Sequence, residues 1–163
     1  MSTHRMLTVT FALIASIACN PFHQNQAVQV SAQDATLNSR WHANLASPAS
    51  LAGAVQMNGS ASMAPSPSGT STTITINLAN ASPGGSHPWA IHMGQCGTGM
   101  DSGVFGTSDA YKSLEVQSDG AATGAATVPV PTPSTGSYFV VVLASTANFE
   151  TIVACGNLAP PTQ

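Results

Sequence analysis

Residues 73–78 alternate between apolar and polar side chains. Ile74, Ile76 and Leu78 share one face of an extended chain, whereas the residues between them are threonine and asparagine. Residues 41–45 alternate in the same way. This period of two predicts strands that bury one face and expose the other.

Further short apolar and β-branched runs follow at a spacing of roughly ten residues. The run 138–143 is the most hydrophobic and is expected to form a central strand. Turn signals such as Asn58-Gly59 and Asp119-Gly120 separate the runs, and no segment has the pattern of an amphipathic helix. About seven or eight short strands predict an all-β fold, either an antiparallel β-sandwich or a Greek-key barrel. The remaining predicted strands include residues 111–116, a run that ends at 130, and 151–155.

The first 18 residues resemble a secretory signal peptide. They begin with a basic segment, continue in an apolar run of about 13 residues and end in small residues. The apolar run is too short to span a bilayer. Cys19 follows at once, so a lipoprotein-type signal with a lipidated Cys19 is one interpretation and ordinary secretion is the other. Residues 19–38 are expected to form a flexible tether, 39–159 the β-domain and 160–163 a tail. The chain is therefore expected to be exported, as a periplasmic protein, an outer-envelope lipoprotein or a secreted protein.

The low content of charged residues restricts the kinds of partner that the protein can bind. Charged residues make up 6% of the chain: 3 are lysine or arginine and 6 are aspartate or glutamate, which gives a formal net charge of −3. After the signal only Arg40 and Lys112 are basic, so no basic patch for nucleic acid or anionic lipid can form. Polarity must come from uncharged side chains, which is typical of an extracellular or envelope protein.

Two segments together resemble the copper/zinc superoxide dismutase family. Residues 84–96 have the sequence G-G-S-H-P-W-A-I-H-M-G-Q-C, and residues 153–158 have V-A-C-G-N-L. The resemblance implies a Greek-key β-domain of that family and a disulfide between Cys96 and Cys155. Secreted CHRD-type β-domains, which also carry an H-I-H-x-G strand, are a weaker alternative.

The resemblance can be tested one metal ligand at a time. In the family an H-x-H strand holds copper, and here its two positions are Ala90 and His92. A later copper histidine corresponds to Leu143, and the arginine that guides the anionic substrate corresponds to Ile152. The zinc loop corresponds to residues 97–111, which contain Asp101 and Asp109 but no histidine. One histidine cannot hold either metal, so the resemblance implies a scaffold that has lost both.

The remaining candidate ligands have two interpretations. In the first, His92 is partly buried and hydrogen-bonded inside the barrel, while His87 and His42 are exposed. In the second, His92 binds copper weakly together with His87, His42 or Met93. The other methionines, Met57, Met63 and Met100, are expected to fill the core rather than bind Cu(I).

Four bulky residues are expected to pack rather than to bind ligands. Trp41 and Trp89 are assigned to the core or its rim. Val104 and Phe105 are expected to turn inward and hold residues 97–111 in place without zinc.

These observations favour an exported, non-catalytic, superoxide dismutase-like β-domain that acts as a binding or structural module of the envelope. It would carry no cofactor, and its partner would be a protein or another envelope component. If the signal is of the lipoprotein type, a lipid on Cys19 would tether it to a membrane. The alternative is a copper-binding protein with residual or atypical superoxide dismutase activity, which leaves the question of catalysis open.

Overall fold

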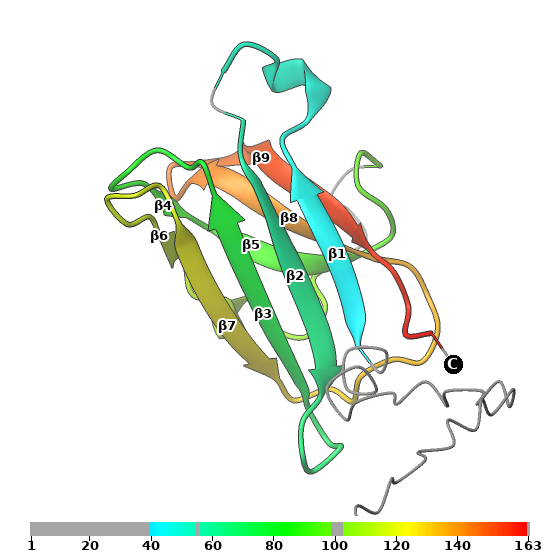
Figure 1. The fold of residues 1–163 in the computed structure, drawn as a ribbon. Helices are drawn as coiled ribbons and strands as arrows, with labels where there is room; N and C mark the ends of the chain where they lie inside the picture. Colours follow the sequence, from blue (N-terminus) through cyan, green and yellow to red (C-terminus); the bar gives the residue numbers. More distant parts are fainter. Residues whose placement is uncertain (1–39, 55, 99–102, 163) are drawn as a thin grey trace, which may run out of the picture.

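The computed structural model describes residues 40–54, 56–98 and 103–162, and within them the chain is all-β. The predicted signal (1–18) and the predicted tether (19–38), which includes Cys19, lie outside the described residues. Met100 and Asp101 lie outside them as well. The elements, shown in Figure 1, are β1 (Trp41–Ala46), η1 (Ala49–Leu51), β2 (Asn58–Pro65), β3 (Thr72–Ala79), β4 (Ser86–His87), β5 (Trp89–Met93), η2 (Ser108–Ala110), β6 (Leu114–Glu115), β7 (Ala122–Val128), β8 (Tyr138–Ser145) and β9 (Asn148–Leu158).

Seven of these strands form one antiparallel sheet in the order β5-β8-β9-β1-β2-β3-β7. The sheet is strongly curled into a half-barrel, so that β5 and β8 pass behind β2 and β3 in Figure 1. Strands β4 and β6 pair in a second, two-stranded sheet. The predicted strand 73–78 is confirmed as β3, and the run 138–143 is confirmed as β8, an interior strand of the sheet. The predicted strand 111–116 was too long, because only Leu114–Glu115 pairs with β4.

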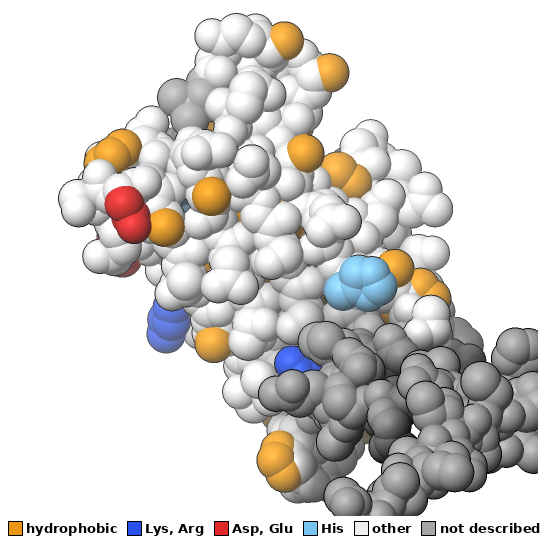
Figure 2. Space-filling model, viewed as in Figure 1, with side chains coloured by type: hydrophobic (Ala, Val, Ile, Leu, Met, Phe, Trp, Pro, Cys, Tyr) orange, Lys and Arg blue, Asp and Glu red, His pale blue; other side chains and the backbone are white. Residues whose placement is uncertain are grey.

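The front of the sheet, made by β1, β2, β3 and β7, separates apolar from polar residues. Trp41, Ile74 and Val128 turn inward and are completely buried. The outward positions of these strands carry serine, threonine, asparagine, alanine and histidine, and Figure 2 shows that face almost without charged side chains. Strict alternation therefore places the main core on the concave side of the half-barrel.

Strand β8 is buried on both faces. Val140 and Val142 belong to the main core, whereas Phe139, Val141 and Leu143 point to the opposite side of the sheet. There they form a second cluster, which we call the outer apolar cluster. Its members are Phe139, Val141, Leu143 and Cys155, with Cys96 and Ile152 packed against them.

The close approach of two strands explains why a glycine, Gly156, follows the second cysteine. A side chain at Gly156 would meet the backbone of Asn44 and the side chain of Leu45, because β9 approaches β1 closely at this point. Only glycine leaves room for the two backbones. Among the described residues no helix is long and apolar enough to cross a membrane.

Candidate functional site

The three positions singled out for a lost copper site lie together. Ala90 and His92 alternate with the core residues Trp89 and Ile91 on β5, so they share the opposite face of that strand. Together with Leu143 of the neighbouring strand β8, they line one hollow of about 300 Å³. All three residues therefore lie at the same hollow.

His92 is buried, but not inside the barrel. Its side chain is 8% exposed, and its ring lies on that of Phe139, with centroids 5.6 Å apart and planes inclined at 33°. Phe139 belongs to the outer apolar cluster, on the side of the sheet away from the main core. The expectation that His92 lies inside the barrel is therefore wrong, because the period of two turns Trp89 and Ile91 inward instead.

His87 is also buried, at 6% exposed, whereas it was expected to be exposed. Pro88 separates β4 from β5, and its carbonyl oxygen accepts a hydrogen bond from the backbone N–H of Leu143 at 2.8 Å. Beyond that break His87 turns its Nδ1 to the carbonyl oxygen of Leu143, 3.0 Å away. His42 is exposed on β1, as expected, and does not line the hollow at His92.

The segment after β5 is held by backbone and apolar contacts. The backbone N–H of Phe105 donates to the carbonyl oxygen of Ile91 at 2.7 Å, which places the segment along the free edge of β5. Phe105 is buried and Val104 is half-buried against the core, so the predicted inward packing is confirmed. The Tyr111 hydroxyl donates to the carbonyl oxygen of Phe105 at 2.7 Å, and burial raises the pKa of this hydroxyl well above its usual range.

The residues present do not fit the copper and zinc ions that the resemblance implies. Ala90 and Leu143 offer only hydrocarbon beside His92, and Ile152 packs against the outer apolar cluster without any charge. Asp109 is exposed in η2. Within residues 40–54, 56–98 and 103–162, no three His, Cys, Asp or Glu side chains are grouped so that they could hold a metal ion.

The methionines and tryptophans are arranged mostly as expected. Met57 and Met63 fill the main core, but Met93 is 45% exposed. Trp41 and Trp89 are buried, and each indole N–H donates to a backbone carbonyl oxygen, that of Pro133 at 2.8 Å and that of Lys112 at 2.7 Å.

Cys96 and Cys155 form a disulfide, with their Cα atoms 6.0 Å apart. The backbone N–H of Cys96 donates to Oδ1 of Asn157 at 2.7 Å, so two bonds fasten the start of the segment after β5 to β9. The pairing that the resemblance implied is confirmed.

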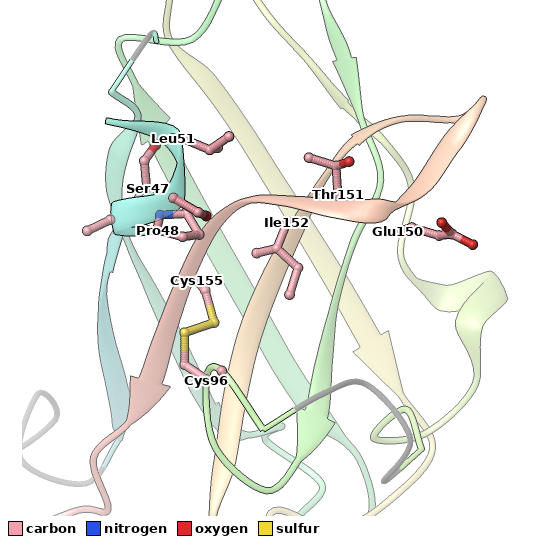
Figure 3. A pocket seen from close by; sticks show the side chains of 11 residues that line it. Ser47, Pro48, Leu51, Cys96, Glu150, Thr151, Ile152 and Cys155 are labelled. Carbon is pink, nitrogen blue, oxygen red and sulfur yellow. A yellow bond between two sulfur atoms is a disulfide. The ribbon is translucent and has the colours of Figure 1, made fainter. Parts of the chain in front are cut away.

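A second hollow of about 550 Å³, which no sequence pattern predicted, lies on the other side of the outer apolar cluster. Its walls are formed by residues 46–48, 50 and 51, by the disulfide and by residues 150–152 of β9 (Figure 3). No local pattern identifies it, since its walls come from segments about 100 residues apart. No protein-family model matches this chain, and no curated protein matches it either.

Proposed function

We propose that this chain is an exported, non-catalytic domain with the Greek-key fold of the superoxide dismutases, and that it acts as a binding module of the cell envelope. One observation carries the proposal: Ala90 and Leu143 line the same hollow as His92. A copper centre needs several imidazole ligands to hold both oxidation states, and this hollow supplies one.

The hollow at His92 has features of a small-molecule site. Its volume of about 300 Å³ lies at the lower end of the range for such sites. Apolar side chains make up the larger part of its walls, and five polar residues lie among them. Binding of a small, mainly apolar ligand suits these walls better than electron transfer does. The polar lining residues are His92, Ser108, Tyr111, Ser113 and Thr146.

Two further observations support export. A disulfide persists in oxidising compartments, and Cys96 and Cys155 form one. The outward positions of the front strands carry uncharged polar residues, as on many extracellular proteins. In this proposal residues 1–18 direct export, and a lipid on Cys19 tethers the domain through residues 19–38 to a membrane.

Copper titration followed by electron spin resonance tests the proposal. The wild-type protein should bind Cu(II) at most weakly, whereas Ala90→His combined with Leu143→His should bind it measurably, because three imidazoles would then meet at one hollow. Superoxide dismutase turnover should stay low even in the double variant, since Ile152 provides no charge to attract the anionic substrate.

A matched control adds two histidines elsewhere. Ala79 and Ala125 are exposed on β3 and β7, so Ala79→His with Ala125→His adds the same number of imidazoles away from the hollow and should leave copper affinity at the wild-type level. Tight, stoichiometric binding by the wild type would support the alternative, a copper protein with atypical dismutase activity. A double variant at Ala90 and Leu143 that binds no copper would show that these positions do not correspond to the family's ligands.

A further inference from the structure

The hollow of about 550 Å³ has firm walls. Ser47 fastens the segment after β1 to the sheet, because its hydroxyl donates to the carbonyl oxygen of Val153 at 2.7 Å and accepts from the backbone N–H of Met57 at 2.9 Å. The disulfide holds the opposite wall. In Figure 3, Ile152 lies between Pro48 and Glu150, with the disulfide beside it.

Most of the lining is apolar. Pro48, Leu51, Ile152 and the disulfide offer hydrocarbon and sulfur surfaces. The volume falls within the range of small-molecule sites, and an apolar group that enters would remove these surfaces from water.

Glu150 is the one charged side chain among the lining residues. Arg40 and Lys112, the basic residues of the described part of the chain, do not line the hollow, so neither neutralises this carboxylate there. Two of the lining hydroxyls are already engaged: that of Ser47 as above, and that of Thr151 as acceptor from the Asn148 side chain at 3.0 Å. Glu150 is exposed, and in Figure 3 its side chain lies beyond Ile152 and points outward, so the negative charge is at the rim of the apolar surface.

We propose that this hollow binds a small organic ammonium ion, a primary amine attached to an apolar body. The apolar body packs on Leu51, Ile152 and the disulfide, and the ammonium group forms an ion pair with Glu150. A ligand of the same shape with a carboxylate is repelled, and one with a hydroxyl lacks the ionic contribution. This site is separate from the hollow at His92, so its failure would leave the proposed function standing.

Three matched probes test the inference by calorimetric titration of the disulfide-bonded protein at low ionic strength: 2-phenylethylamine, 2-phenylethanol and 3-phenylpropanoate. Affinity should fall in that order. Glu150→Gln should reduce the affinity for the amine about fivefold, the upper range for a partly exposed ion pair, and leave the affinity for the alcohol unchanged. Added salt should weaken binding of the amine only.

Two control variants separate charge from shape. Glu115 is exposed on β6, outside the hollow, so Glu115→Gln should leave amine affinity unchanged while removing the same formal charge. Leu51→Ala should weaken amine and alcohol alike, because both use the apolar wall. Equal affinity of the wild type for amine and alcohol, an equal loss in both glutamine variants, or no binding at millimolar amine would each overturn the inference.

Discussion

His87 contributes to the fold through a single hydrogen bond, from its Nδ1 to the carbonyl oxygen of Leu143 at 3.0 Å. Because a carbonyl oxygen only accepts, Nδ1 is the donor in this bond. Nε2 of the same ring is buried near Gly85 and has no hydrogen-bond partner among the described residues. The ring therefore fills space between two sheets and satisfies the backbone of β8 at the same time.

At this scale, replacing His87 by alanine removes both the packing and the hydrogen bond. The variant His87→Ala should lower the free energy of unfolding by about 2–4 kcal/mol, since it leaves a cavity and a buried carbonyl oxygen with one partner fewer. Urea denaturation measures the change. His42→Ala is the matched control, because His42 is exposed and its loss should change stability by less than about 0.5 kcal/mol. Similar small effects in both variants would contradict the structural role of His87.

The segment between β5 and β6 is held by one tyrosine and one phenylalanine. Tyr111 is 8% exposed, its ring packs edge-on against Trp89, with centroids 5.1 Å apart, and its hydroxyl reaches the backbone of Phe105. Side-chain packing and a hydrogen bond thus hold this segment against the core. We expect EDTA to leave the melting temperature unchanged.

The same tyrosine predicts a pH dependence. Burial raises the pKa of Tyr111 in the folded protein above the value of about 10 in an unfolded chain. Folding therefore favours the protonated phenol, so this contribution to stability is complete below about pH 10 and is lost as pH rises further. The variant Tyr111→Phe should lose about 1 kcal/mol at pH 8, where the hydrogen bond is missing. Its free energy of unfolding should then fall less than that of the wild type between pH 9 and 11, as followed by urea denaturation. Parallel pH curves would refute this reasoning.

Local sequence patterns predicted the strands well, but they predicted less well what surrounds each side chain. The alternation at Ile74 and Ile76 defined β3, because a half-buried strand records its two faces in its own sequence. The strand rule also placed Ala90 beside His92. It failed at His87, because Pro88 ends β4 and interrupts the period of two.

The rest of the site depends on contacts between distant segments. The outer apolar cluster brings Cys96 and Ile152 against β8, and such a contact leaves no periodic signal in either segment. The hollow beside Glu150 is likewise formed by segments that are far apart in the sequence. Sequence could indicate that both faces of β8 are buried, since an unbroken apolar run, residues 139–144, lies along it, but not which segments cover them.

At the scale of the whole molecule, the disulfide joins the segment after β5 to the last strand, β9. The disulfide links residues separated by 59 positions, and β6, β7 and β8 lie between them. It also forms a wall of the second hollow and part of the outer apolar cluster. Its loss should therefore affect both stability and binding.

The double variant Cys96→Ala with Cys155→Ala should lower the free energy of unfolding by about 4 kcal/mol, because an unfolded chain freed from a loop of this length gains conformational entropy. Alanine suits the test, since Cys155 is 6% exposed and a hydroxyl there would be buried among apolar side chains. Reduction of the wild type should lower stability by a similar amount, which separates the effect of the bond from that of the substitutions. The prediction requires that the disulfide is formed in the purified protein. A thiol assay on the denatured, unreduced Cys19→Ser protein checks this and should detect no free thiol. Two reactive thiols, or equal stability with and without the bond, would show that packing alone holds the segment after β5 against β9.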